Sequence, residues 1–392
     1  MTRLFAYSLK VASLALLSAL VAGCEDEDND IHQGNWRNTY KYYLGTARGG
    51  AVTFQLVVDD TLRAVVGTGG NTANSRDRER FADFYMFTYT RSGLQETVRY
   101  DRLSAEEVAA GVKCTRAVAP LPTAEGARAR SGAVGFAING KGYVGLGFDG
   151  TDCLSDFWCY DPEANAWSPA PPYPGDAVRN AFSFVIDNVA YVGGGEDADN
   201  NILGDFYRFD GQTWEPLQTL GVPRSQASAF VCNGRGYVYG GTNGGRVVTF
   251  ECYDPRTTQW TQLNRLMDAT EETFDDQYGR LAGYGATAFV IDDNTSETRA
   301  FITTGGPNGS GQLTWEYNPF TDRWVQKTSF EGGPRKFATS FVLNANVDGK
   351  GWRQTGFVTT GGTSDLAVSG SGGLFYADTW AWCPDEPWEE RD

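Results

Sequence analysis

The chain has 392 residues, with 33 Lys or Arg against 49 Asp or Glu, so its formal net charge is −16. This acidity argues against nucleic acid as a partner, because affinity for phosphates comes largely from Lys and Arg. His32 is the single histidine, so Ser-His-Asp catalysis and multi-histidine metal sites lack their components. The 48 glycines and 14% aromatic residues favour many short strands joined by tight turns.

The first segment is typical of an export signal. Arg3 and Lys10 precede the apolar run 11–21, which is too short to span a bilayer as a helix. The sequence LVAGC, which ends at Cys24, resembles the lipobox of bacterial lipoproteins, whose cysteine carries the lipid and becomes the mature N-terminus. We therefore predict a signal peptide over 1–23 and membrane attachment through lipidated Cys24. An ordinary signal peptide with an incidental cysteine is the alternative.

An acidic run, EDEDND, follows Cys24 directly. Self-repulsion favours a disordered tether, which we place at 24–34. The run also resembles the surface-export signal of Bacteroidetes lipoproteins, which implies the bacterial outer membrane and a surface-exposed protein, with a periplasm-facing anchor as the alternative. An extracytoplasmic site permits disulfides, but the spacing of the six other cysteines does not determine their pairing.

From about residue 48 onward, a three-part pattern repeats six times. It consists of A-x-x-F, then a hydrophobic strand ending in glycines, then an aromatic strand running into a turn and a tryptophan. Residues three apart on a strand point to opposite faces, so each first strand offers a methyl group to one side and a ring to the other. The glycines supply positive φ or close backbone approach. The A-x-x-F pairs are Ala51/Phe54, Ala133/Phe136, Ala181/Phe184, Ala227/Phe230, Ala286/Phe289 and Ala338/Phe341.

These parts resemble the kelch repeat of the galactose oxidase/kelch-like superfamily. The resemblance implies an all-β fold, a six-bladed kelch β-propeller over 35–392 with four antiparallel strands per blade. The first repeat lacks its tryptophan, and we assign Trp388 to the last. Because little chain follows Trp388, how the ring closes is left open, and the segment 35–43 is a candidate for the closing strand.

Arginines recur six residues before the repeat phenylalanine, a position that the kelch resemblance places at the channel mouth. In the third repeat the arginine comes one place late, and the fifth has Gly283 instead. Such guanidinium groups could bind a carboxylate or sulfate ligand, or each could bond carbonyls or an acid of the next blade. The candidate ligand-binding residues are Arg48, Arg130, Arg179, Arg224 and Arg335.

Three classes of function fit the sequence. The preferred one is a recognition module that binds a glycan, another anionic ligand or a partner protein through the face carrying the long loops. The second is an enzyme, and the third is a non-catalytic scaffold of an envelope complex. We expect no cofactor and no metal; calcium at the acidic loop EDADNN, 196–201, is an alternative.

Among enzymes, copper radical oxidases of the galactose oxidase type are excluded because no histidine lies in the predicted propeller. A resemblance to N-acetylneuraminate epimerase would make Glu196 the catalytic base and Arg224 the partner of the substrate carboxylate. The loop motif of that family is missing after Glu196, so catalysis is the less favoured interpretation.

Overall fold

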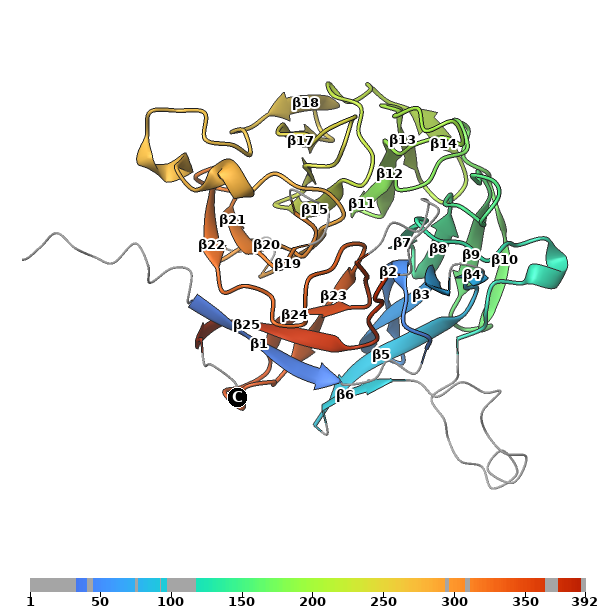
Figure 1. The fold of residues 1–392 in the computed structure, drawn as a ribbon. Helices are drawn as coiled ribbons and strands as arrows, with labels where there is room; N and C mark the ends of the chain where they lie inside the picture. Colours follow the sequence, from blue (N-terminus) through green and yellow to red (C-terminus); the bar gives the residue numbers. More distant parts are fainter. Residues whose placement is uncertain are drawn as a thin grey trace, which may run out of the picture.

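The computed structural model describes residues 33–40, 45–74, 77–91, 93–96, 118–292, 296–306, 311–363 and 373–388. They form six antiparallel sheets arranged as blades around a central channel, which confirms the six-bladed propeller (Figure 1). The predicted leader, Cys24, the acidic run and Cys114 lie outside the described residues. No helix among the described residues is long and apolar enough to cross a bilayer.

Each blade contains four strands in the order a, b, c, d from the channel outward. The first blade also has a short hairpin extension, β4 (Asp77–Arg80), paired with its second strand. The first three blades consist of β2 (Gly49–Val58), β3 (Thr61–Asn74), β5 (Phe84–Thr90) and β6 (Gly93–Glu96); β7 (Val134–Ile138), β8 (Lys141–Gly145), β9 (Phe157–Asp161) and β10 (Ala166–Ala170); and β11 (Phe182–Ile186), β12 (Val189–Gly193), β13 (Phe206–Phe209) and β14 (Trp214–Pro216).

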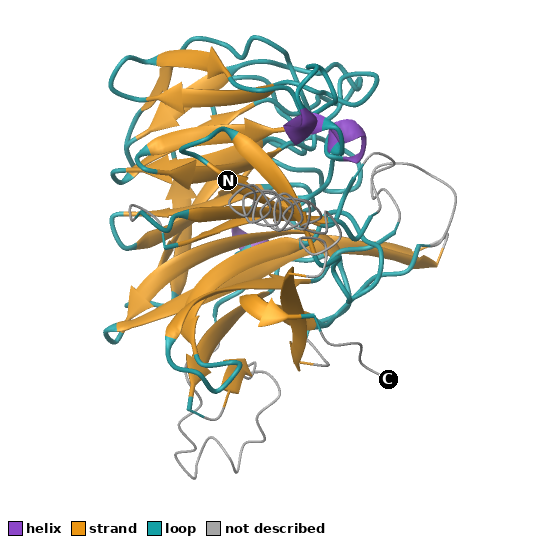
Figure 2. Cartoon of the chain, turned by 90° about the vertical axis from the view of Figure 1, so that its left-hand side faces the viewer, coloured by secondary structure: helices purple, strands orange, loops and turns teal. Residues whose placement is uncertain are grey.

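The remaining blades follow the same order. They consist of β15 (Ser228–Cys232), β16 (Arg235–Tyr239), β17 (Phe250–Asp254) and β18 (Gln259–Gln262); β19 (Thr287–Ile291), β20 (Arg299–Thr303), β21 (Thr314–Asn318) and β22 (Arg323–Lys327); and β23 (Thr339–Ala345), β24 (Arg353–Thr359), β25 (Thr379–Pro387) and β1 (Gln33–Tyr40). The short turns between strands a and b and between c and d share one face, which we call the turn face. The other face carries the longer b–c and d–a connections, and we call it the loop face (Figure 2).

The A-x-x-F pattern places its two residues as predicted. A cavity of about 150 Å³ in the channel is lined by the alanines of all six pairs. The phenylalanines are buried between the sheets instead, and Phe54 contacts Tyr160 and Trp167 of the next blade. Small side chains therefore allow six strands to converge on one axis, while the rings fill the wedge between neighbouring blades.

The residue before each alanine forms a closed circuit of backbone hydrogen bonds. Its N–H donates to the carbonyl of the equivalent residue in the preceding blade, over 2.8 to 3.0 Å, and the last blade connects back to the first. All six residues have φ between 55° and 66°, the left-handed region. Three are glycine; the others accept a conformation that costs side-chain-bearing residues about 1–2 kcal/mol. The members are Gly50, Gly132, Asn180, Gln226, Gly285 and Phe337.

A second circuit uses a glycine that follows the b strand in five blades and lies within β3 in the first. Its N–H donates over 2.7 to 2.9 Å to the carbonyl six residues before the phenylalanine of the next blade. A Cβ on Gly147 would lie 2.8 Å from the Ser131 carbonyl oxygen, and φ there is +94°, which accounts for the predicted glycine. The donors are Gly69, Gly147, Gly195, Gly241, Gly305 and Gly361.

The ring is closed by β1, which pairs antiparallel with β25 as the fourth strand of the last blade. The candidate closing segment is thereby confirmed, although the strand begins at Gln33, inside the predicted tether. The assignment of Trp388 is wrong, because it follows the end of the third strand, β25. Trp36 takes that place, opposite Trp382, as Trp167 stands opposite Tyr160 in the second blade.

We predict that Trp36→Ala lowers the free energy of unfolding by about 3–5 kcal/mol, because this ring is fully buried against Trp382 and Phe330. Urea unfolding followed by circular dichroism measures the change. Trp352→Ala is the control, since that ring is 52% exposed, and should cost less than about 1 kcal/mol. Equal losses in the two variants would contradict the closing role of β1.

Candidate functional site

Four of the five predicted arginines are fully buried in similar clusters. In the second blade, Arg130 makes two hydrogen bonds of 2.7 Å to the Asp156 carboxylate and one of 3.2 Å to the Leu146 carbonyl. Its Nε donates to the Arg128 carbonyl over 2.9 Å. Arg48 pairs in the same way with Asp83, and Arg335 with Asp378.

Arg224 of the fourth blade shows a variation on this cluster. The residue directly before the third strand is Thr249 instead of aspartate, and its hydroxyl accepts a bond of 2.8 Å from Arg224. The carboxylate comes from Glu251 on β17, which also bonds the guanidinium. The fifth blade lacks both partners, with Gly283 and Leu313 at the two positions.

This geometry matches the structural alternative, except that the acid belongs to the same blade and not to the next. The four side chains have no exposed surface, and their N–H groups are used by protein acceptors. Ligand contact at these positions remains a prediction that the geometry does not support. The acid that pairs with each arginine was not predicted from the sequence. A signal was present, because an aspartate directly precedes the aromatic third strand in every blade that has an Arg–Asp pair.

Arg179 and Glu196 lie together on the loop face, each 8% exposed. The Arg179 Nε donates to Glu196 Oε1 over 3.0 Å, and Asn180 donates to the same oxygen over 2.8 Å. A further Arg179 bond of 2.7 Å reaches Asn200. The carboxylate proposed as a catalytic base is therefore held by two donors. Arg224, its proposed companion, is occupied by Glu251, so the epimerase alternative gains no support.

The loop EDADNN, which raised the calcium alternative, is folded by its own hydrogen bonds. The Asp197 carboxylate accepts the N–H groups of Asp199 and Asn201 over 2.9 and 2.8 Å, and the Asn201 amide over 2.8 Å. Such side-chain-to-backbone bonds are typical of turns. Two of the loop's acids are thus engaged within the protein, Glu196 with Arg179 and Asp197 within the turn.

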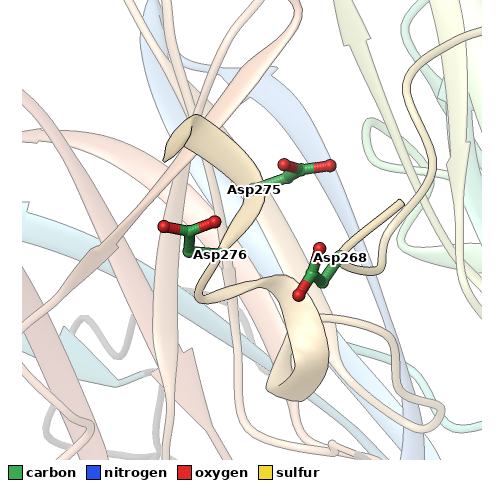
Figure 3. Close-up of side chains that lie close together, drawn as sticks. All are labelled: Asp268, Asp275 and Asp276. Atoms are coloured by element: carbon green, nitrogen blue, oxygen red, sulfur yellow. The ribbon is translucent and has the colours of Figure 1, made fainter. Parts of the chain in front are cut away.

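A different acidic group lies in the connection between the fourth and fifth blades. Oxygens of Asp268, Asp275 and Asp276 lie within 4.8 Å of one another around two short helical turns (Figure 3). Asp275 is buried and accepts three hydrogen bonds from Ala269 and Thr270, so it shapes the turn. The other two aspartates are exposed to solvent.

The exposed charge of the described part of the loop face is mostly acidic. Arg128 is held by Asp149 and Asp152 at 2.6 and 3.1 Å, and Arg323 approaches Glu272 at 3.7 Å. The connection that holds the aspartate group also carries Glu271 and Glu272, both exposed. With four arginines buried, this face offers carboxylates to solvent where the sequence predicted cations.

Among the described cysteines, Cys153, Cys159, Cys252 and Cys383 are free thiols, and Cys232 is buried. Burial is the main cause that raises the pKa of Cys252 to about 11 and that of Cys383 to about 12. Such thiols stay protonated at neutral pH and are poor nucleophiles. Cys252 and Cys383 therefore belong to the buried core of the propeller.

Comparison with known proteins agrees with this architecture. A family model described as the Kelch motif matches residues 129–173 and 223–267, in the second and fourth blades. Kelch-like protein 25 of Xenopus tropicalis is 29% identical over 118 residues, which cover 29% of this chain and 20% of that protein. Human Kelch-like protein 33 is 32% identical over 129 residues, 32% of this chain and 24% of that protein. The matched region thus spans about a fifth to a quarter of these relatives.

A solved structure titled "Structure of YjhT" has a TM-score of 0.60 at 13% identity, covering 87% of this chain and 96% of that chain. At this identity the likeness concerns the fold alone. The sheets and the arginine clusters define a six-bladed β-propeller. More particularly, the chain is a kelch-repeat propeller, a class of domain that typically serves in protein interaction.

We predict that Asp156→Asn lowers the free energy of unfolding by about 3–5 kcal/mol, because it leaves the buried Arg130 charge without its counterion. Asp205→Asn is the matched control. Asp205 also stands directly before a third strand, but the arginine position of its blade is Val178. This variant should change stability by less than about 0.5 kcal/mol. Similar losses in both would show that the aspartate position matters without the arginine.

The same pair predicts a dependence on pH. Burial raises the pKa of Asp156, but the hydrogen bonds and charge of Arg130 outweigh it, so the net pKa lies below the usual value. A carboxyl with a depressed pKa stabilises the fold above its unfolded pKa, and this contribution is lost as the pH falls through the lower folded value. The difference between wild type and Asp156→Asn should therefore be constant above about pH 5 and shrink below about pH 4. Unfolding titrations at several pH values measure it.

Proposed function

We propose that this chain is a membrane-attached, extracytoplasmic recognition module whose loop face binds a partner protein with a basic surface. The observation that carries the proposal is the acidic connection between β18 and β19, which holds exposed carboxylates in a fixed conformation. The kelch family supports a protein partner, since its propellers typically serve in protein interaction.

The conformation of this connection is determined by buried anchors. Tyr278 is 1% exposed, and its hydroxyl donates to the Trp324 carbonyl over 3.2 Å and accepts the Trp324 N–H over 2.5 Å. Its ring meets Phe274 edge to face, with 5.9 Å between centroids. The connection is thereby attached to β22 of the fifth blade. Preorganised loops lose little conformational entropy on binding, which favours recognition.

The sign of the exposed charge decides between the partners that the sequence left open. An anionic glycan or another anionic ligand depended on guanidinium groups open to the channel, and four of them are buried against acids. Complementarity with Glu271, Glu272 and Asp276, of which Glu272 also lies 3.7 Å from Arg323, calls for Lys or Arg on the partner. We therefore favour an envelope protein over an anionic glycan.

For attachment, we predict that Cys24→Ser moves the protein from the membrane fraction to the soluble extracytoplasmic fraction, because the lipid has no acceptor. Fractionation and immunoblotting measure the distribution, and protease treatment of intact cells distinguishes surface exposure from a periplasm-facing anchor. Cys114→Ser is the matched control and should remain attached. Retention of Cys24→Ser in the membrane would contradict the anchor.

For recognition, we predict that Glu271→Gln with Glu272→Gln weakens capture of envelope proteins by the immobilised full-length chain at least tenfold. The control, Asp60→Asn with Asp187→Asn, removes equal charge from two exposed a–b turns of the turn face and should leave capture unchanged. Quantitative mass spectrometry of the captured proteins measures both. Capture that is insensitive to the first pair, or equally sensitive to both pairs, would contradict a binding role for the loop face.

A further inference from the structure

A hollow of about 670 Å³ lies between the first and second blades on the turn face, away from the proposed protein-binding loops. Its walls come from the end of β2 and the turn after it, from β3 and β5 of the first blade, and from β8 and the turns of the second blade. Figure 1 shows these two blades side by side, with β3 in the first and β8 in the second. Its lining includes the charged side chains of Arg63, Lys141, Asp59, Asp161 and Glu163 and the apolar side chain of Met86.

The repeats provide an internal comparison for Arg63. Six residues before each glycine of the second circuit, the six blades have Arg63, Lys141, Val189, Arg235, Arg299 and Thr355. Three of the four cations in this series pair with a carboxylate on the third strand of their own blade: Lys141 with Asp161 at 3.1 Å, Arg235 with Asp254 at 3.1 Å, and Arg299 with Glu316 at 2.7 Å. The third strand supplies this acid from either of two positions: Asp161 and Asp254 directly follow the residue paired next to the cation, and Glu316 stands opposite Phe301.

In the first blade, neither of these positions holds an acid, since they are occupied by Thr88 and Met86. Met86 stands opposite Val65 on β5, as Glu316 stands opposite Phe301 on β21, so Met86 takes the place of the carboxylate. The Arg63 guanidinium lies 3.6 Å from the Met86 sulfur, which is a weak acceptor. In the fifth blade, the two corresponding bonds from Arg299 to Glu316 measure 2.7 and 3.0 Å.

The Arg63 side chain is only 12% exposed, yet its donors are poorly satisfied. Its Nε is buried and has no hydrogen-bond partner within the described ranges. The nearest carboxylate, that of Asp59, is 3.3 Å away and 86% exposed, so water competes for it. A buried N–H group without an acceptor costs free energy, which a matching ligand would recover.

We propose that Arg63 binds a carboxylate group which a ligand places in this hollow. The guanidinium presents two parallel donors to a carboxylate, the geometry of the Arg299–Glu316 pair. Val57, Val58 and Met86 supply apolar contact for the chain that carries the carboxylate. Asp59, Asp161 and Glu163 also line the hollow, so general attraction of anions is weak, and the fork of Arg63 provides the specificity.

The test follows the Arg63 Nε–H resonance of the full-length chain, assigned by its loss in Arg63→Lys. The probes are acetate and a capped Ala-Glu-Ala peptide, titrated at constant ionic strength with chloride as the balancing anion. We expect a saturable shift of this resonance. An at least tenfold lower Kd for the peptide would identify acidic protein segments as the source of the carboxylate, and equal values would identify small free carboxylates.

Met86→Glu separates this proposal from a general effect of charge. The new carboxylate stands where Glu316 stands in the fifth blade, so it should occupy Arg63, reduce probe binding at least tenfold and raise the midpoint of thermal unfolding. Met86→Gln is the uncharged control and should retain more binding than Met86→Glu. Arg299→Lys, in the equivalent position of a paired blade, should bind the probes as wild type does. The absence of a saturable shift, or unchanged binding by Met86→Glu, would overturn the proposal.

Discussion

The propeller depends on a circuit of six backbone hydrogen bonds around its axis. Each bond requires a left-handed residue directly before the channel-facing alanine, and three blades meet this requirement with Asn180, Gln226 and Phe337 at positive φ. The strain is tolerated because each residue is held by the blades on both sides. The circuit sets the distance between neighbouring inner strands, and with it the space that the repeat phenylalanines fill.

The arginine clusters extend this axial order outward. The carbonyl of Arg130 accepts the second circuit's bond from the first blade, while its guanidinium holds Asp156 at the start of its own third strand. One residue thus connects two blades and orients the loops above them. Because its backbone and its side chain both make structural hydrogen bonds, this arginine is buried and not exposed for ligand binding. The exposed charge of the described loop face is consequently set mostly by its acids, and on the turn face Arg63 is incompletely paired.

The six blades could be predicted from the sequence because the repeated alanine, phenylalanine and glycines each meet the same local structural requirement in every blade. Trp388 was misplaced because strand pairing between the two ends of the chain leaves no local signal, and Trp36 lies far from the repeat that it completes. The arginines were correctly aligned, but their burial depends on an aspartate some 26 to 43 residues away. The incomplete pairing of Arg63 likewise required the register of β3 against β5, in which Met86 replaces an acid.

The closing strand also bears on how the molecule is made. Gln33 pairs with Pro387, so β1 can pair only when the other blades have brought the two ends of the ring together. Contacts of such long sequence separation form late in folding. Until then Trp36 and the edge of β1 are without their native cover, a state that is open to association with other chains. The pairing of β1 with β25, and not the folding of any single blade, is therefore the step that closes the ring.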